Sequence, residues 1–163
     1  MTKAVFPASF DPVHNGHINI INRASKLFDE VYIAVYDKPL KNLLFSPEER
    51  ISLVQQTFGD NPKTTVVGYS GLTIDFCKKM NVDAIVRGLR VVSDFELEFR
   101  MAHTNKLLFE EVETIALITD PQLTFLSSST VREIASLNGD VSKMVPPHVN
   151  EALIVKFANK IEE

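Results

Sequence analysis

The sequence predicts an α/β protein with a doubly wound, Rossmann-like sheet of five parallel strands and helices on both faces. Short runs rich in valine, isoleucine and aromatic residues recur along the chain, at residues 4–6, 31–36, 65–69, 83–86 and 114–118. Their apolar residues are nearly continuous rather than alternating, which is typical of strands buried on both faces. Segments with helical periodicity separate these runs, and this alternation favours a parallel sheet with right-handed crossovers.

The helical segments have recognisable starts and ends. Apolar residues fall on one face over residues 18–28, at the spacing of an amphipathic helix. The second helix has the clearest start, because Ser46 supplies an N-cap, Pro47 suits the first helical position and Glu49 completes a capping box. This helix is expected to run to residue 58, and the later helices to cover residues 72–80, 94–109, 130–137 and 149–160.

Composition restricts the class of protein. The 163 residues are 45% hydrophobic and 23% charged, as in an ordinary globular chain, so a single domain over residues 1–163 is expected. The net charge of −4 offers no basic excess for nucleic acid or for a membrane surface. A single cysteine, Cys77, fits a reducing compartment. No signal peptide and no run of about 20 apolar residues is visible, so we expect a cytoplasmic protein.

The loop between the first strand and the first helix is the most informative segment. Residues 6–17, Phe-Pro-Ala-Ser-Phe-Asp-Pro-Val-His-Asn-Gly-His, end an apolar run at Pro7 and contain two turn signals before the helix. A helix N-terminus attracts phosphate through its free N–H groups and partial positive charge. Gly16 allows a close backbone approach. The imidazoles of His14 and His17 at such a place therefore suggest chemistry on a phosphate.

Two alternative roles of these histidines stay open. Histidines in surface loops are common and often have no function. A His-x-x-His pair also suits zinc, but zinc normally needs at least three protein ligands. The remaining candidate ligands, at positions 77, 103 and 148, do not lie at ligand spacing. We therefore expect no metal site built from protein side chains.

Two further motifs follow predicted strands. Residues 87–90, Arg-Gly-Leu-Arg, place two guanidinium groups where both can bind one polyanion. In the alternative, these arginines form solvated ion pairs with Asp94 or Glu96. The run 127–129 has three serine hydroxyls where one is enough for a helix N-cap, which suggests a phosphate cradle rather than a plain cap. Because the carboxyl ends of parallel strands border one crevice, these motifs are expected to converge there.

Together these motifs identify a resemblance. The strand, the loop ending in His-x-Gly-His and the later serine run resemble the nucleotidyltransferase superfamily with that signature. The whole chain resembles the bacterial phosphopantetheine adenylyltransferase family. This resemblance rests on Ser9-Phe10-Asp11-Pro12, Asn15-Gly16-His17, Arg87-Gly88-Leu89-Arg90, Asp94-Phe95-Glu96, and Phe125-Leu126-Ser127-Ser128-Ser129 with Arg132.

The resemblance implies reversible transfer of the adenylyl group of ATP to 4′-phosphopantetheine, giving dephospho-coenzyme A and pyrophosphate. It also implies Mg²⁺ bound with ATP, a homohexamer, and coenzyme A as an inhibitor. The attacking phosphate monoester is already ionised at neutral pH, so positioning and charge stabilisation should dominate the catalysis. The alternatives are another small-molecule nucleotidyltransferase, using nicotinamide mononucleotide or a CTP-linked substrate, and an inert module that binds adenine nucleotides.

The resemblance also assigns residues. His17 and Lys41 are the expected catalytic residues: His17 donates to the α-phosphoryl oxygens and Lys41 aligns the phosphates. The expected ATP-binding residues are Ser9, Phe10, His17, Gly88, Leu89, Arg90, Glu98, Leu123, Thr124, Phe125, Leu126, Ser127, Ser128 and Ser129. The expected contacts of the pantetheine substrate are Ser9, Lys41, Thr73 and Arg87, with Arg87 anchoring its phosphate.

Some of these residues have simpler roles when taken alone. Thr73 suits a helix N-cap, Lys41 a solvent-exposed loop, and Glu98 a solvated helix face. The chain also departs from the family's usual sequence, with Ala8 in place of a glycine and Leu123 in place of an aromatic residue. Alanine at position 8 is acceptable only where the backbone φ is negative.

Overall fold

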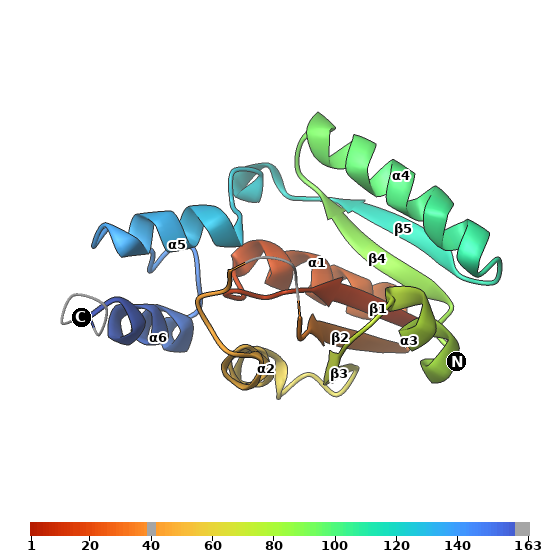
Figure 1. Ribbon diagram of the computed structural model, residues 1–163, viewed down its shortest axis with the longest axis horizontal. Helices are drawn as coiled ribbons and strands as arrows, with labels where there is room; N and C mark the ends of the chain where they lie inside the picture. Colours follow the sequence, from red (N-terminus) through yellow and green to blue (C-terminus); the bar gives the residue numbers. More distant parts are fainter. Residues whose placement is uncertain (39–41, 159–163) are drawn as a thin grey trace.

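In a computed structural model, residues 1–38 and 42–158 are described. Their strands form one parallel five-stranded sheet in the order β3-β2-β1-β4-β5, as the sequence predicts (Figure 1). The strands are β1 Lys3–Ala8, β2 Glu30–Tyr36, β3 Thr64–Tyr69, β4 Ala84–Leu89 and β5 Glu113–Ile118. The chain moves outward from β1 to β3 and then returns to the other side of β1 for β4. The topological switch point therefore lies between β1 and β4.

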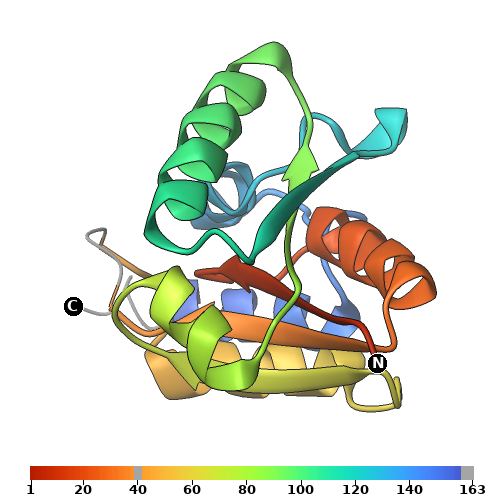
Figure 2. The same cartoon turned by 90° about the vertical axis from the view of Figure 1, so that its right-hand side faces the viewer.

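Helices cover both faces of this sheet (Figures 1 and 2). They are α1 Asn15–Leu27, α2 Pro47–Phe58, α3 Thr73–Met80, α4 Val92–Leu108, α5 Ser128–Ser136 and α6 Pro147–Ala158, with a short 3₁₀ helix, η1, at Pro121–Leu123. Helices α1 and α2 pack on one face, and α3 and α4 on the other. Helices α5 and α6 lie beyond the carboxyl ends of the strands.

The central strands alternate between two apolar clusters. Phe6 of β1 and Val86 of β4 belong to the cluster on the α1 face, whereas Val5 and Ile85 belong to the cluster on the α3 face. Val5 pairs with Ile85 across the β1–β4 ladder. Successive side chains of a strand point to opposite faces. At the carboxyl end of β4, Gly88 therefore lies on the α1 face with Val86, and Arg87 points to the opposite face.

Strand β1 continues through Pro7, where the sequence predicts a break. Its ladder with β4 is limited to Ala4 and Val5, whereas its ladder with β2 extends to Ala8. Beyond Val5, the edge that faces β4 needs no backbone donor, so the missing N–H of proline is tolerated there. The carbonyl oxygen of Pro7 accepts a hydrogen bond from Arg87 Nη1 at 2.6 Å. The side chain of Arg87 thus takes the place of the ended ladder.

Several element boundaries also differ from prediction. Helix α1 begins at Asn15, before the expected apolar period, because His14 caps it. Strand β4 extends to Leu89, so the arginine motif begins inside the strand rather than after it. Helix α4 begins at Val92 and α5 at Ser128, each two residues earlier than expected. Hydrogen bonds at the ends of an element determine where it begins and ends, and the periodicity of the sequence does not detect them.

Helix α4 is unlike the other α-helices because none of its residues is buried. Its exposed large apolar side chains are Val92, Phe95, Leu97, Phe99, Met101, Leu107 and Leu108. No helix in the described part of the chain is both long enough and apolar enough to span a bilayer.

Candidate active site

A cavity of about 280 Å³ lies at the switch point, beyond the carboxyl ends of β1 and β4. Its walls come from the end of β1, the start of α1, the end of β4, the first turns of α4 and the start of α5. Side chains that line it include His14, His17, Arg87, Arg90, Glu98, Ser127 and Ser128. The three motifs expected to converge therefore share one cavity.

His14 is the N-cap of α1. Its Nδ1 accepts hydrogen bonds from the backbone N–H groups of Gly16 at 3.1 Å and His17 at 3.4 Å. The imidazole lies so close to the helix start that a Cβ at position 16 would be 2.8 Å from His14 Cε1. Glycine at position 16 is thus required by the capping imidazole.

The orientation of His17 is fixed by the same turn. The backbone N–H of His14 donates to His17 Nδ1 at 3.2 Å, and the two rings stack with their centroids 3.7 Å apart. Burial lowers the pKa of His14 to about 3. Burial, followed by His14, Arg87 and Arg90, lowers the pKa of His17 well below 6.5. Both imidazoles are therefore neutral at pH 7. Since Nδ1 of His17 accepts, its proton is on Nε2, which makes Nε2 a hydrogen-bond donor.

Each arginine of the cavity is paired with a carboxylate of α4. Arg87 makes a bidentate pair with Glu98, with Nε and Nη2 at 2.8 and 2.7 Å from its two oxygens. Arg90 binds Asp94 through Nε at 3.0 Å and the Leu126 carbonyl through Nη1 at 2.9 Å. The alternative prediction, that these arginines form ion pairs with Asp94 or Glu96, is thus confirmed for Asp94. The partner of Arg87 is Glu98 and not Glu96. We name the pairs Arg87–Glu98 and Arg90–Asp94 the cavity ion pairs.

The three serines diverge. Ser127 caps α5 by accepting from the Thr130 N–H at 3.1 Å, and Ser128 Oγ donates to the Pro12 carbonyl at 2.9 Å. Both line the cavity, whereas Ser129 lines a separate depression beside Arg132. The structure therefore places two of the three expected hydroxyls at the cavity.

The remaining predicted residues lie at different places. Gly88 and Leu126 line the cavity, whereas Ser9, Phe10, Leu89, Leu123, Thr124 and Phe125 are not part of its lining. Leu123 packs against the core and Phe125 is 60% exposed. Ala8 lies in β1, where the extended backbone suits alanine, and the left-handed φ of this segment occurs at Phe10, at 51°. Lys41 lies outside the described residues.

Thr73 lines an adjoining pocket of about 100 Å³, which shares Pro7, Arg87 and Glu98 with the main cavity. Leu72, not Thr73, is the N-cap of α3, so the capping role of Thr73 is wrong. The Thr73 hydroxyl instead lies 2.9 Å from the Tyr69 hydroxyl. Glu98 is not a solvated residue either, because its side chain is 13% exposed and ion-paired.

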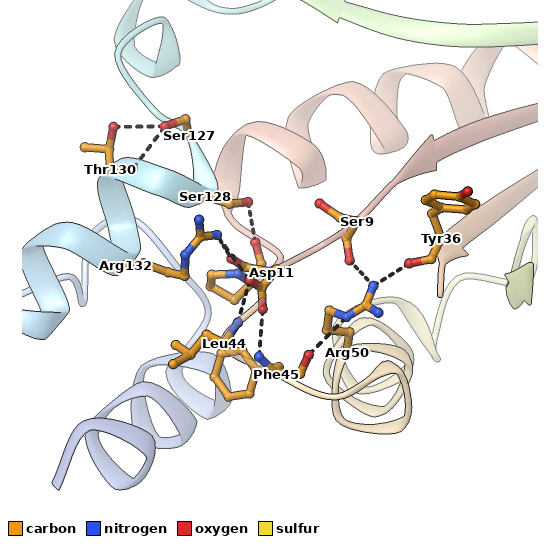
Figure 3. A network of polar contacts seen from close by, with 11 residues as sticks. Ser9, Asp11, Tyr36, Leu44, Phe45, Arg50, Ser127, Ser128, Thr130 and Arg132 are labelled. Carbon is orange, nitrogen blue, oxygen red and sulfur yellow. Dashed lines mark hydrogen bonds and ion pairs between the residues drawn. The ribbon is translucent and has the colours of Figure 1, made fainter. Parts of the chain in front are cut away.

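Three charged residues join the loops that follow β1 and β2 to helices α2 and α5, and we name them the loop clamp: Asp11, Arg50 and Arg132 (Figure 3). The Asp11 carboxylate, 1% exposed, accepts from the backbone N–H groups of Leu44 and Phe45, each at 2.9 Å. Arg132 of α5 pairs with this carboxylate at 3.3 Å and also donates to the Asp11 carbonyl.

Arg50 of α2 has no exposed surface. Its guanidinium donates to the carbonyls of Ser9, Tyr36, Asp37 and Phe45, at 2.6 to 3.3 Å. Arg50 therefore ties the loop after β1 to Tyr36 and Asp37, which precede residues 39–41, and to Phe45, which follows them. Sequence reasoning missed Arg50. A charged residue on the same helical face as the buried Leu53 and Val54 is the signal that could have found it.

Comparisons with known proteins agree with this geometry. Residues 5–134 match the family model described as cytidylyltransferase-like. The chain is 49% identical over 160 residues to a phosphopantetheine adenylyltransferase of Dictyoglomus thermophilum, covering 98% of each chain. It is 50% identical over 153 residues to one from Roseiflexus sp., covering 94% of this chain and 96% of that protein. The fold is similar to that of Plasmodium falciparum nicotinic acid mononucleotide adenylyltransferase complexed with NaAD, with a TM-score of 0.70 at 15% identity, covering 96% and 95% of the chains.

Proposed function

Because this chain belongs to the cytidylyltransferase-like family, and within it to the phosphopantetheine adenylyltransferases, we propose that its cavity transfers the adenylyl group of ATP to 4′-phosphopantetheine. The products are dephospho-coenzyme A and pyrophosphate. Identity of about one half over nearly the whole chain supports this substrate pair. The observation that carries the chemistry is the neutral His17 at the cavity, whose Nε2–H has no acceptor among residues 1–38 and 42–158.

In this reaction an ionised phosphate oxygen of the acceptor attacks the α-phosphorus, and the bond to pyrophosphate breaks. Negative charge develops on the α-phosphoryl oxygens, and a fixed neutral donor stabilises it without giving up its proton. The backbone amide of His14 holds the His17 ring, so Nε2–H needs no reorientation. His17 acts as a hydrogen-bond donor and not as a general base.

The arginines supply positive charge for the phosphates. We assign Arg87 to the phosphate of phosphopantetheine, because Arg87 borders both the main cavity and the adjoining Thr73 pocket. Arg90, beside Ser127, is assigned to the β- and γ-phosphates. Lys41 completes the proposal as the residue that aligns the reacting phosphates.

Mg²⁺ is proposed to arrive with ATP. Both carboxylates of the cavity, on Asp94 and Glu98, are engaged by arginines. Among the described residues no group of three or more His, Cys, Asp or Glu side chains could hold a metal ion. Mg²⁺ commonly keeps several waters and binds substrate phosphates, and it would neutralise phosphate charge here. The residues present fit an ion carried by the nucleotide.

One assay separates this function from its alternatives. Pyrophosphate release from ATP is measured with 4′-phosphopantetheine, with nicotinamide mononucleotide, and with no acceptor. We expect release only with 4′-phosphopantetheine. Release with nicotinamide mononucleotide alone would indicate the other nucleotidyltransferase, and no release with either acceptor would indicate an inert binding module.

The role of His17 has its own prediction. His17→Ala removes the transition-state donor, so kcat should fall about 10²- to 10³-fold while the Kd of ATP changes little. Steady-state kinetics and calorimetry measure the two quantities. His148→Ala, a histidine outside the cavity, is the control and should leave kcat unchanged. Loss of ATP affinity with kcat retained would contradict the assignment.

We further propose self-assembly through α4, up to the homohexamer that the resemblance implies. The exposed apolar side chains of α4 support a partner on this surface. Sedimentation of the chain and of Leu97→Glu tests it, since a buried glutamate should shift the variant to smaller species. Inhibition by coenzyme A, which has the same pantetheine arm as the product, and a cytoplasmic location belong to the same proposal.

A further inference from the structure

Phe10 has a backbone conformation that phenylalanine rarely adopts. Its φ is 51°, in the left-handed region, where the other non-glycine members among the described residues are Asn81 and Asn138. Asparagine tolerates this region, whereas a bulky side chain is strained in it. Glycine would adopt the same φ without strain. A strained phenyl ring at this position therefore points to a role of the ring itself.

The loop clamp holds the chain on both sides of Phe10 (Figure 3). On one side, Arg50 Nη1 donates to the Ser9 carbonyl at 2.7 Å. On the other side, Arg132 donates to the Asp11 carbonyl and pairs with its carboxylate. Backbone strain persists only where the surrounding structure over-determines it. The clamp supplies such surroundings, and it thereby fixes the direction of the Phe10 side chain.

The ring of Phe10 packs against the imidazole of His17. Phe10 is 1% exposed, and the two ring centroids are 4.9 Å apart with an interplanar angle of 54°. Phe6 meets the same imidazole edge-on, with centroids 6.0 Å apart. Both separations are typical of aromatic contacts. Together with the stacked His14, three rings therefore contact the imidazole.

The hydrogen bond to Nδ1 does not fix the His17 ring by itself. The N–H of His14 holds one atom of the imidazole, and the ring could still rock about this contact. The phenyl rings of Phe6 and Phe10 restrict that motion and exclude water from the part of the imidazole that they cover. Because burial lowers the pKa of His17, the same rings also favour its neutral form.

We propose that Phe10 is a positioning residue for His17: the loop clamp sets its phenyl ring against the imidazole, and this ring keeps the Nε2–H donor fixed and shielded from water. The inference rests on the proposed adenylyl transfer for the use of that donor. Phe10 is not part of the cavity lining, so its ring acts through His17.

The first test compares Phe10→Leu with Phe58→Leu. Phe58 of α2 is a buried phenylalanine of the same apolar cluster, so both changes remove a ring from the core and should lower the Tm. Only Phe10→Leu should lower kcat, by about 10-fold, while the Kd of ATP changes by less than about twofold. Steady-state kinetics and calorimetry measure these quantities, and equal kcat values of the two variants would overturn the proposal. Phe10→Met, with an adaptable side chain, replaces Phe10→Leu if the latter does not fold.

A double-mutant cycle separates positioning from packing. In a His17→Ala chain the donor is already absent, so adding Phe10→Leu should cause no further fall in kcat. A packing role predicts the opposite, because it does not depend on the imidazole. The same fall in kcat with and without His17 would therefore overturn the proposal.

Imidazole ¹H–¹⁵N spectra of the free protein measure the effect without substrate. The signals that are missing from the spectrum of His17→Ala identify His17. In the unchanged chain and in Phe58→Leu these signals should show the neutral Nε2–H form from pH 7 down to pH 5. In Phe10→Leu the pKa should rise toward its ordinary value, so the signals should titrate within this interval. Identical His17 spectra of the two variants would overturn the proposal.

The charged and titratable groups near the His17 ring are the same in all of these chains that retain it. They are His14 and the arginines of the cavity ion pairs, with the carboxylates of α4 that bind them. A different titration of His17 in Phe10→Leu therefore reports the loss of the phenyl ring.

The spectra need no turnover, so the two proposals can fail separately. If Phe10→Leu alters the His17 spectrum and the unchanged chain releases no pyrophosphate with either acceptor, the positioning role stands and the adenylyl transfer is wrong. If transfer is seen and Phe10→Leu matches Phe58→Leu in kcat and in the His17 spectrum, the transfer stands and the role of Phe10 is wrong.

Discussion

The loop clamp and the cavity ion pairs lie at the same end of the sheet and differ in what holds their arginines. In the clamp, Arg50 binds four backbone carbonyls and has no exposed surface. In the cavity, Arg87 and Arg90 are held chiefly by carboxylates of α4, and about a third of each side chain is exposed. Both arrangements supply acceptors for a guanidinium, but a backbone carbonyl is fixed in place whereas a side-chain carboxylate can move.

This difference indicates that Arg50 stabilises the fold, whereas Arg87 and Arg90 are available to bind a ligand. A backbone carbonyl cannot leave its place without unfolding a loop, so Arg50 is a fixed part of the fold. A carboxylate at the end of a side chain can rotate away when a phosphate, with the same bidentate geometry, arrives. The cavity ion pairs therefore keep their arginines oriented in the free protein and can release them to a polyanion.

The largest effect is expected for Arg50→Met. The change removes the fully buried guanidinium from four backbone carbonyls, of the buried Phe45 and of the half-buried Ser9, Tyr36 and Asp37. The free energy of unfolding should therefore fall by about 3–5 kcal/mol. Urea denaturation measures the loss. Arg100→Met removes an arginine whose side chain is 75% exposed, and should change the stability by less than about 0.5 kcal/mol. Equal effects of the two changes would abolish the distinction between fixed and exchangeable arginines.

Asp11→Asn tests the acidic member of the clamp. An amide can accept from one of the two backbone N–H groups but turns its own NH₂ toward the other, so we expect a loss of about 2–3 kcal/mol. Asp83→Asn is the control, since Asp83 accepts from one backbone amide, of Lys3, at 2.6 Å in an exposed position at the opposite edge. A smaller loss for Asp11 than for Asp83 would contradict the role of the clamp.

The histidine pair predicts a pH dependence that belongs to the cavity. The folded pKa of His14 is lowered to about 3, so below pH 6.5 the unfolded chain takes up a proton that the folded chain does not. Stability should therefore fall as the pH decreases from 6.5 toward 3, by about 2 kcal/mol at pH 5 for this histidine. His14→Asn keeps a capping acceptor and removes the titration. Unfolding curves of both chains at pH 7 and pH 5 measure the difference, and parallel losses would refute it.

The smallest effect on stability is expected for Glu98→Gln. A third of the Arg87 side chain is exposed and glutamine keeps the hydrogen-bonding shape of Glu98, so the change should cost at most about 1 kcal/mol. Glutamine still accepts from Arg87 and keeps it oriented, but it no longer opposes a phosphate by charge. The KM for the phosphopantetheine acceptor should fall about threefold, by the energy of a modest charge interaction. A raised KM would show that Glu98 is needed as a charge and is not an exchangeable partner.

Sequence reasoning recovered the sheet and the convergence of the motifs because both follow from local periodicity and from parallel topology. It missed where β1 and β4 end, since the continuation through Pro7 depends on how far the β1–β4 ladder extends. The partner of Arg87 is eleven residues away on another element, and no periodicity encodes that distance. Arg50 left a signal, which is a charge at a buried helical position.

The capping geometry of the two histidines has a chemical consequence for their reactivity. In a neutral imidazole the nucleophilic lone pair is on the nitrogen without hydrogen, here Nδ1 of both residues, and each of these lone pairs already accepts a backbone N–H. Electrophiles and transition-metal ions would have to break the first turn of α1 to reach one. The two histidines should therefore resist alkylation, acylation and the binding of copper or zinc ions as long as the helix is formed.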